Sequence, residues 1–480
     1  MPAFSVVTQD PQFREVVQNK AFERSFHDAL FPDMVFRHDV EPVEWNANVG
    51  DRMVFSAPGL VKPKMKPIQP QNDPTVSTYG FEQWVAQLQL YGDSIDTYMP
   101  DAVNAIINMF LRNAHQLGLA AAQSINRLVR NKLYAAGLAG NTVTGASAIA
   151  GVTSIRVMRL NGFTTARRPD LANGSPVAFQ PVSATNPLAI DITLVSGVVQ
   201  RTGVTAFTPD NAGDETGPGL ITIADVLGAT GVAARAAVRA VDRTQIVRVG
   251  GGTRVDDVGV SDILRLIDIR SAVARLRTTN VPRHPDGYYH AHFDPVSEGQ
   301  IFADAEFQRL LTALPDHYMY REFAIGALMG TVFMRNNECP QNGTIEGAAA
   351  AAMSAPFGYD EQDPFGGEVW NNGVAATGVE VHRAAFTGYG GLKEYYQNQG
   401  MELTEAGLQG VVAEPQITND GVAVMADRVR LYFRAPQDRL GKNVATTWSF
   451  VGDHPFRTDC TTGDAARYKR VCIVEHGTAA

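Results

Sequence analysis

Cysteine is scarce in this sequence, which has three among its 480 residues: Cys339, Cys460 and Cys472. Their number is odd, they lie far apart, and no two of them form a C-x-x-C pair. A disulfide framework uses an even set of cysteines, and a zinc ribbon uses closely spaced ones. The sequence therefore excludes both kinds of site and favours a reducing compartment.

Long apolar runs are also missing. No window approaches 18 uninterrupted apolar residues, and the first segment, MPAFSVVTQDPQFREVV, has no basic stretch followed by an apolar one. A membrane-spanning helix needs about 20 apolar residues, and a signal peptide needs that two-part start. We therefore expect no membrane partner and a protein that is made in a cytoplasm.

Positive charge is in deficit. Lys and Arg number 41 against 50 for Asp and Glu, which gives a formal net charge of −9. Proteins that bind nucleic acid through charge carry a basic patch or run, and neither end of this sequence carries such a run. The apolar fraction of 45% still predicts an ordered protein, and a chain of 480 residues predicts more than one lobe.

Common catalytic motifs are absent as well. The sequence has no G-x-x-x-x-G-K-[ST], no H-E-x-x-H and no G-x-S-x-G, and its Gly250-Gly251-Gly252 lacks the strand and the acidic partner of a dinucleotide site. We therefore predict that the chain is not an enzyme, that it has no catalytic or cofactor-binding residues, and that it needs no cofactor.

One group of residues does imitate a metal site. His290, His292 and Asp294 stand two residues apart, so on a strand they point to the same face, and imidazole and carboxylate are common metal ligands. No second histidine cluster accompanies them. A strand face followed by an Asp helix cap explains the same residues, so we predict no metal site and keep a metal-dependent enzyme using His290, His292 and Asp294 as an alternative function.

The first 91 residues predict an arm and a loop. Residues 1–50 mix short apolar clusters with polar residues and show no sustained period, which indicates an arm and no core element. Between residues 51 and 91, two strand-like stretches flank a segment with five prolines. Proline excludes a helix interior and a central strand, so we predict an extended two-stranded loop.

A very long helix should follow. Pro100 and Asp101 suit the first turn of a helix, and apolar residues then recur at steps of three and four as far as Val129. We predict a helix from 101 to about 136, within a segment covering residues 92–143. At 1.5 Å per residue it would be about 54 Å long, which is unusual in a compact enzyme.

The texture changes between residues 144 and 252, where short β-branched runs alternate with turn residues. This pattern predicts a mainly β inserted module, with a short alanine-rich helix near Val232 to Ala240. No internal repeat is visible. The predicted class of the whole chain is α+β.

After the module we predict a helix, a strand and a second helix. Ser261 should cap an amphipathic helix that runs from Asp262 to about Leu276. The strand that follows should stop at Asp294-Pro295, where Asp can cap the next helix and Pro can occupy its first turn.

Four segments resemble those of a known family, and they occur in the family's order. They are Asp286-Gly287-Tyr288 through Asp294-Pro295; Ile325-Gly326, Gly330, Phe333-Met334, Asn336-Asn337 and Pro340; VEVHRAAFTGYGGLKEYY around Phe386 and Gly388; and Asp438 through Val444, where Arg439 replaces the usual proline. Following an arm, a loop and a long helix, this succession resembles the major capsid proteins of tailed bacteriophages with the Hong Kong 97-type fold. Within that fold it is most similar to the coat proteins of the phage N-four group.

The resemblance implies a layout for the whole chain. Residues 144–252 have no counterpart in the family and would be an insertion domain. The implied parts are an N-terminal arm at 1–50, an extended loop at 51–91, the spine helix of a peripheral domain at 92–143, the insertion at 144–252, a peripheral-domain helix at 253–285, an axial domain at 286–400 and a return to the peripheral domain at 401–480.

The resemblance also implies a function. Such subunits form hexamers and pentamers that close an icosahedral head around double-stranded DNA, which they enclose without sequence-specific binding. Separate scaffolding, portal and decoration proteins are the further partners it implies. The location would be the virion capsid, assembled in the cytoplasm of a bacterial host. Another virion protein, of the decoration or the tail, is the second alternative, and the long predicted helix disfavours it.

Overall fold

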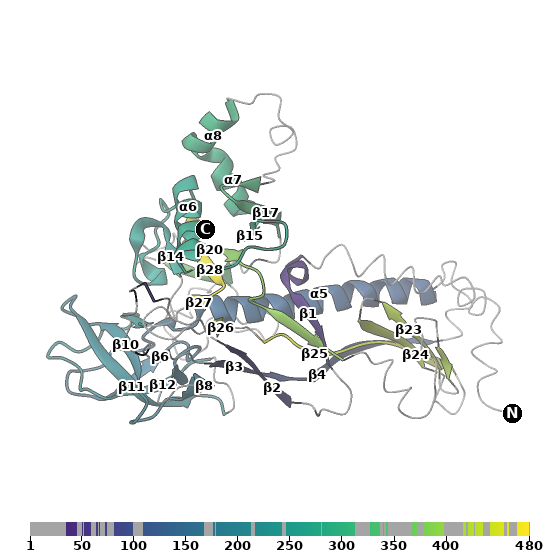
Figure 1. The fold of residues 1–480 in the computed structure, drawn as a ribbon, viewed down its shortest axis with the longest axis horizontal. Coiled ribbons are helices and arrows are strands. Elements are labelled where there is room, and N and C mark those ends of the chain that lie inside the picture. Colours follow the sequence, from purple (N-terminus) through teal and green to yellow (C-terminus); the bar gives the residue numbers. More distant parts are fainter. Residues whose placement is uncertain are drawn as a thin grey trace. The chain divides into compact units, whose positions relative to one another are not determined.

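A computed structural model gives the fold of the chain (Figure 1). It divides into two compact units, which we describe separately: unit 1 comprises Met1–Val54, Val85–Val129 and Leu392–Pro455, and unit 2 comprises Phe55–Trp84, Arg130–Gly391 and Phe456–Ala480. The residues that the structure describes are 35–45, 50, 52–58, 64, 65, 67, 73, 81–98, 109–167, 176, 177, 179–212, 217–241, 246–279, 281–312, 327–336, 339, 342, 343, 367–371, 378–397, 416–418, 421–426, 428–434, 442–455, 458, 459 and 468–479.

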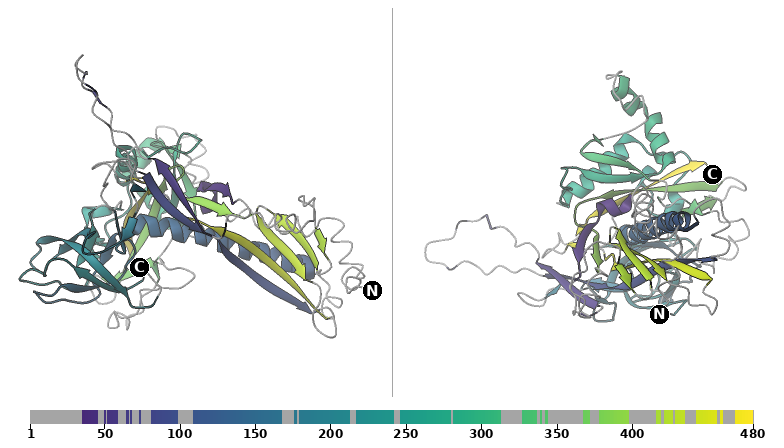
Figure 2. Two further views of the ribbon diagram at one scale, coloured as in Figure 1. Left: turned by 60° about the horizontal axis from the view of Figure 1, so that its bottom comes forward. Right: turned by 90° about the vertical axis from the view of Figure 1, so that its right-hand side faces the viewer.

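Unit 1 contains a seven-stranded sheet. Its strands follow the order β1-β21-β25-β24-β23-β22, and β4 pairs with β25. Figure 2 shows β4 and β25 as long neighbouring strands, and they pair antiparallel from Gln89–Gly452 to Tyr98–Asn443. The bounds are β1 Glu41–Glu44, β4 Gln89–Tyr98, β21 Lys393–Tyr396, β22 Gln416–Thr418, β23 Gly421–Ala426, β24 Val429–Arg434 and β25 Asn443–Asp453.

The first described segment of the chain is part of the core of unit 1. The 3-10 helix η1, Phe36–Asp39, buries Phe36 completely, and the backbone N–H of Phe36 donates to Asn126 Oδ1 at 2.9 Å. Trp45 is buried too. The prediction that residues 1–50 contain no core element is therefore wrong for this stretch. Phe36 and Trp45 belong to the core although no periodic apolar pattern surrounds them, because other parts of the unit cover their rings. Residues before 35 lie outside the described part.

The predicted long helix is present as α5, Met109–Leu138. Its 30 residues correspond to about 45 Å, and the predicted first turn, at 101–108, lies outside the described residues. Up to Val129 the helix belongs to unit 1, and from Arg130 it belongs to unit 2. Its buried apolar residues recur at helical steps, as predicted: Ala114, Leu117, Ala121, Ala122, Ile125, Val129, Leu133 and Leu138.

The two strands of the predicted loop are also present. They are β2, Arg52–Pro58, and β3, Phe81–Gln87, which lie in a small sheet of order β2-β3-β8, where β8 is Pro176–Val177. The rings of Phe55 and Trp84 stack with centroids 6.0 Å apart. The sequence analysis ended this region at residue 91, whereas β4 continues as a strand to Tyr98, where it is held by its pairing with β25.

Unit 2 contains an eight-stranded sheet, which we call the central sheet. Its main order is β14-β28-β20-β15-β17-β16, with β19 paired to β20 and β18 paired to β19. One face packs into an apolar cluster that includes Leu266, Tyr289, Phe293 and Phe386. The bounds are β14 Ile246–Arg248, β15 Tyr289–Phe293, β16 Ala327–Leu328, β17 Thr331–Arg335, β18 Asn342–Gly343, β19 Gly367–Asn371, β20 Gly378–Thr387 and β28 Val471–Ala479.

Three helices accompany the central sheet: α6 Leu266–Thr278, α7 Pro295–Ala303 and α8 Ala305–Thr312. The predicted start of α7 is confirmed, with Asp294 as the cap and Pro295 in the first turn. The predicted start of α6 is wrong by four residues. The N–H of Leu266 donates to Asp304 Oδ2 at 2.8 Å, and the N–H of Arg265 donates to Asp268 Oδ2 at 3.1 Å, so a distant and a local carboxylate together cap this helix. Asp262 instead accepts the N–H of Gly259.

Residues 141–240 contain a second sheet of unit 2, which we call the module. Its strand order is β5-β13-β10-β11-β12-β6, and its core is an apolar cluster centred on residues such as Phe163, Ile190 and Val204. The predicted mainly β character of this region is confirmed. The bounds are β5 Asn141–Val143, β6 Ser154–Val157, β10 Leu188–Thr193, β11 Val199–Pro209, β12 Gly219–Ile223 and β13 Ala237–Ala240, with the small pair β7 Thr165–Arg167 and β9 Phe179–Pro181 beside them.

The alanine-rich helix predicted at Val232 to Ala240 is wrong. Residues Ala237–Ala240 form β13, a strand that pairs with both β10 and β5. Arg235 has a φ of +61°, which a helix does not allow. Pairing on both sides and the burial of Val238 outweigh the modest helical preference of alanine.

The strands near the end of the chain divide between two sheets. β24 and β25 lie in the sheet of unit 1, whereas β28 lies in the central sheet of unit 2, between β14 and β20. The remaining short elements are η2 Val249–Gly251, η3 Val255–Asp257, β26 Thr458–Asp459 and β27 Tyr468–Lys469. Among the helices in the described part of the chain, none has the length and apolarity needed to cross a membrane.

Candidate functional site

The three residues of the metal hypothesis have different partners. His290 Nε2 lies 2.8 Å from Asp286 Oδ2, and the ring of His290 stacks on His284 with centroids 3.8 Å apart. His292, two residues further along β15, is completely buried. The carboxylate of Asp294 faces other side chains, described next. The shared direction expected from spacing alone therefore does not produce a common ligand set from these three residues.

Asp294 lies at the centre of a buried polar cluster. Its Oδ1 accepts hydrogen bonds from the backbone N–H of Ser297 at 3.2 Å and from the Ser297 hydroxyl, and its Oδ2 lies 2.5 Å from His382 Nδ1. Ser297 Oγ is also 2.7 Å from His476 Nε2, and the rings of His382 and His476 stack. One cap thereby ties α7 to β20 and β28.

Burial and neighbouring charge set the protonation of this cluster. Burial favours the neutral form of Asp294, but hydrogen bonding and charge from His382 outweigh it and hold the pKa of Asp294 below its usual range. Burial lowers the pKa of His476 to about 3, a shift that nearby His382 assists and Asp294 opposes. Ser297, Asp294 and the two histidines are buried. A substrate cannot reach the Ser297 hydroxyl without disrupting the core, so the cluster has the features of structural support.

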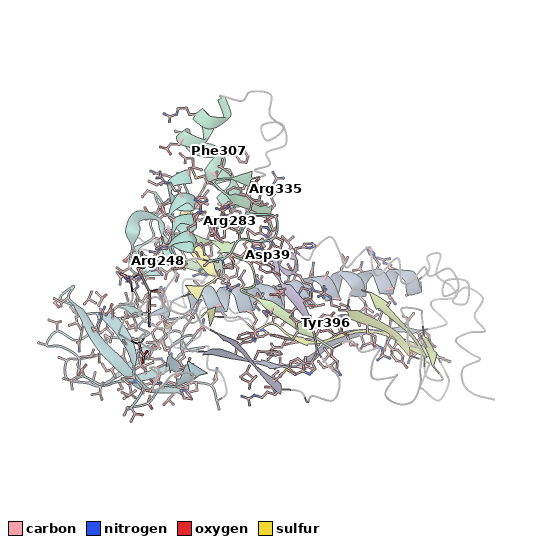
Figure 3. The ribbon with its side chains drawn as sticks, viewed as in Figure 1. Asp39, Arg248, Arg283, Phe307, Arg335 and Tyr396 are labelled. Atoms are coloured by element: carbon pink, nitrogen blue, oxygen red, sulfur yellow. The ribbon has the colours of Figure 1, made fainter. Side chains whose placement is uncertain are left out.

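A row of buried charges crosses the central sheet beside it. Glu475 on β28 stands in register with Arg248 on β14 and with Arg383 on β20. Glu475 Oε2 accepts from Arg248 Nε at 2.8 Å, and Oε1 accepts from Arg383 Nε at 3.0 Å. Figure 3 labels Arg248. All three side chains are 3% exposed or less. Burial would raise the pKa of Glu475, but the two guanidinium groups lower it, so the carboxylate stays charged.

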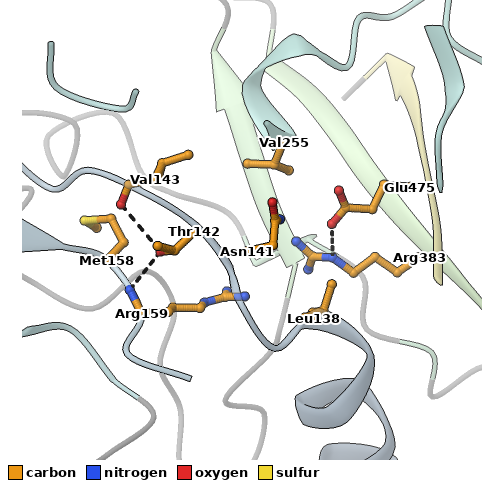
Figure 4. Close-up of a pocket in the computed structure, with 9 residues that line it drawn as sticks. All are labelled: Leu138, Asn141, Thr142, Val143, Met158, Arg159, Val255, Arg383 and Glu475. Carbon is orange, nitrogen blue, oxygen red and sulfur yellow. Dashed lines mark hydrogen bonds and ion pairs between the residues drawn. The ribbon is translucent and has the colours of Figure 1, made fainter. Parts of the chain in front are cut away.

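A small cavity borders this row. Figure 4 shows Arg383 and Glu475 on one side of it and Thr142 and Met158 on the other. Its volume of about 30 Å³ is far below the roughly 300 Å³ at which small-molecule sites begin. This cavity can hold a water molecule but not a cofactor.

A second buried charge cluster fixes the first described segment within unit 1. Arg37 of η1 donates to both oxygens of Glu394 on β21, at 2.8 Å and 2.7 Å, and Arg428 Nη1 lies 3.0 Å from Glu394 Oε1. Burial would raise the pKa of Glu394, but Arg37 and His454 lower it well below its usual range. The neighbouring β1 pairs in parallel with β21 along its whole length.

The solved structures to which this chain is similar include phage capsids. The chain is similar to the capsid of Ralstonia phage GP4, with 12% identity, a TM-score of 0.45, and coverage of 92% of this chain and 91% of that one. It is similar to the capsid asymmetric unit of cyanophage Pam1, with 8% identity, a TM-score of 0.47, and coverage of 95% and 93%. For the capsid of cyanophage P-SCSP1u the values are 9%, 0.43, 93% and 88%. No protein-family model matches the sequence, and no curated protein is similar to it.

The sequence analysis missed both buried charge clusters. A signal for the first was present, because Glu475 and His476 directly follow the apolar run Val471–Val474, and a charge inside a buried strand requires a partner. The partner's identity was not readable, since Arg248 lies 227 residues away. Arg37 and Glu394 are 357 residues apart and carry no comparable signal.

Proposed function

We propose that this chain is a structural coat subunit of a tailed-phage head. Copies of it would assemble as hexamers and pentamers into a closed icosahedral shell around double-stranded DNA. The finer assignment to a Hong Kong 97-type fold, closest to the phage N-four group, is part of the same proposal. It rests on the motif segments named in the sequence analysis.

One observation carries the proposal. Three of the four segments that resemble the capsid family lie side by side as consecutive strands of the central sheet. The first segment contains β15, which pairs in parallel with β17 of the second, residue for residue from Tyr289–Thr331 to Phe293–Arg335. On its other side β15 pairs with β20 of the third segment, from His290–Thr387 to His292–Ala385.

The structure around these strands explains why particular motif residues occur at their positions. Gly330 has a φ of +81° in the turn between β16 and β17, and Gly287 has a φ of +87° in the turn before β15. Such values favour glycine. Asp294 and Pro295 end β15 and begin α7. The quoted segments thus form one connected substructure, which supports a family relationship better than separate matches would.

The other parts of the chain fit a role in assembly. Strands β2 and β3 would carry a loop that overlaps a neighbouring subunit, and the 30-residue helix α5 would be a long rod within the subunit. In the proposed layout they are the extended loop and the spine, residues 286–400 are the axial domain, and 253–285 and 401–480 belong to the peripheral domain. A net charge of −9 suits an inner wall, because like charge keeps packaged DNA from adhering to it.

The proposal includes partners and location. Scaffolding, portal and decoration proteins would be separate chains, and the shell would form in the cytoplasm of a bacterial host and remain in the virion. The described helices offer no membrane span. The different partners of His290, His292 and Asp294 give the metal-enzyme alternative no support.

Electron microscopy of the purified chain tests the proposal. We expect closed particles of uniform diameter, formed either on expression or after dialysis into assembly buffer with a neutral crowding agent. Tubes would indicate a tail protein. A chain that stays monomeric across concentration, salt and crowding conditions would contradict the coat function, and metal content measured on the same sample would test the enzyme alternative.

A further inference from the structure

Three loops of the module meet at one end of its sheet and form a surface that we call the tip. They are the β10–β11 turn at 194–200, the segment 225–232 and the segment 146–152. The backbone N–H of Val195 donates to the Gly231 carbonyl at 3.1 Å, and Ala148 and Val232 exchange two backbone hydrogen bonds. The Gln200 side chain bonds the backbone of both Val226 and Gly228 at 2.9 Å. These hydrogen bonds join the three loops into one continuous surface.

Aliphatic side chains point into solvent on every loop of the tip. Their exposed fractions lie between 57% and 77%, whereas turns of this kind usually carry polar residues. Beneath them the core of the module is already complete, with Leu194, Leu227 and Val232 buried. The exposed side chains are Ile149, Val195, Val198, Val199 and Val226.

The tip is also almost free of charge. No Asp, Glu, Lys or Arg occurs in residues 141–155, 192–200 or 226–234, although these types make up 19% of the chain. At its margin, Arg201 is paired with Asp191 at 2.8 Å, and Asp225 accepts a hydrogen bond from Thr202. Exposed apolar surface from which charge has been removed is characteristic of the centre of a protein interface.

We infer that the tip is an interface between copies of this chain, in which the tip of one copy packs against the tip of another. This deepens the proposed coat function and rests on it. The chain has a net charge of −9, so most pairs of identical surfaces repel one another. A patch without charge avoids that repulsion, which suits a contact about a twofold axis, because the same patch of both copies takes part there. A strongly charged partner such as nucleic acid finds no complementary group on it.

The size of the patch fixes how it acts. Five aliphatic side chains offer much less than the roughly 800 Å² that each partner buries in a standard stable interface. Two free subunits therefore do not dimerise through the tip alone. Once other contacts hold neighbouring subunits in place, the effective concentration is high and the small apolar contact adds to the stability of the assembly.

Lysine substitutions test the inference on assembled particles of the full chain. Val198→Lys and Val226→Lys place a charge in the proposed contact, while Leu220→Lys is the matched control: it adds the same charge at an exposed leucine on β12 of the same module. Far-ultraviolet circular dichroism should show the same fold in all of them. Val198→Ser, which removes apolar surface without adding charge, is the second variant should a lysine prevent folding.

We expect the tip lysines to raise the chain concentration needed for particle formation by about tenfold or more, because an unpaired charge in an interface is costly. Val198→Ser should have a smaller effect in the same direction, and Leu220→Lys should assemble as the unmodified chain does. If the tip variants assemble and dissociate like the control, the tip of one copy does not bind the tip of another. The proposed coat function would not be affected by that result. If the unmodified chain forms no particles at all, the coat function itself fails.

Discussion

The central sheet and the module, both parts of unit 2, differ in where they place their charged side chains. The central sheet buries the row Arg248, Glu475 and Arg383 in register across three strands. The ion pairs between residues of the module lie at its surface, where the side chain of Arg201 is 67% exposed, and its core consists of aliphatic groups and Phe163. Its buried Arg235 pairs with Asp256, which lies outside the module. The central sheet therefore combines an apolar face with a buried row of charges, whereas the core of the module is apolar.

Because of this difference, the two regions should lose stability in response to different substitutions. A buried charge that loses its partner keeps its full desolvation penalty, so the central sheet should be sensitive to single changes in charge. An apolar core loses stability in proportion to the volume removed and is insensitive to pH. Three experiments, taken in order of expected effect, would break or sharpen this contrast.

The largest effect should come from Glu475→Gln. The change removes the counter-charge that Arg248 and Arg383 share in the core and should lower the free energy of unfolding by about 3–5 kcal/mol. Urea unfolding measures the loss, and hydrogen exchange should place it in β20 and β28. The matched control is Asp191→Asn, which breaks an exposed pair of similar geometry and should cost less than about 1 kcal/mol. Equal costs for the two variants would remove the distinction between the regions.

Ile190→Ala should come next. Ile190 is completely buried on β10 between β11 and β13, and its truncation should cost about 2–4 kcal/mol. Leu220→Ala, at a position that is 40% exposed in the same module, should cost much less. Hydrogen exchange should show faster opening of β10 and β11 with β20 unchanged. Faster exchange in both sheets alike would mean that they unfold as one cooperative unit.

The smallest effect is the response to mild acid. Since the pKa of His476 is about 3 when folded and near 6.5 when unfolded, the unfolded chain takes up the extra proton as pH falls. Stability from this group is complete above pH 6.5 and is lost progressively toward pH 3, by roughly 2 kcal/mol between pH 6.5 and 5. The depressed pKa of Asp294 adds a loss at lower pH, below its unfolded value.

A pH series of urea unfolding checks this response. His476→Asn removes the titrating ring and should flatten the slope between pH 6.5 and 5. The protection factors of the module's amides, corrected for the pH dependence of intrinsic exchange, should stay constant across the series. An unchanged slope in the variant would show that another group controls acid stability.

Features set by neighbouring residues were predictable from the sequence. The Asp294-Pro295 helix start depends on adjacent residues, and the period of α5 depends on residues three and four apart, so both were found. The start of α6 and the conformation of Ala237–Ala240 were not, because a cap from Asp304 and pairing with β10 and β5 decide them. These contacts join residues far apart in the chain, which local patterns do not encode.

The candidate site shows the same limit. The spacing of His290, His292 and Asp294 was readable, but their partners were not. Asp294 is paired with His382, which a separate strand supplies, so the residues that looked like ligands belong to a support of the core. The spacing of side chains along a strand gives their direction, and tertiary contacts decide what they meet.

The first and last residues of the module lie next to each other. The N–H of Ala240 donates to the carbonyl of Gly140 at 2.7 Å, and Asn141 stands opposite Arg239 in the β5–β13 pair. A hundred residues thus begin and end side by side, so a short turn can span the same distance between the flanking segments, provided that Asp256, the buried partner of Arg235, is changed as well. Such a junction lets evolution, or a protein engineer, exchange one appendage for another while the rest of the subunit is left largely as it was.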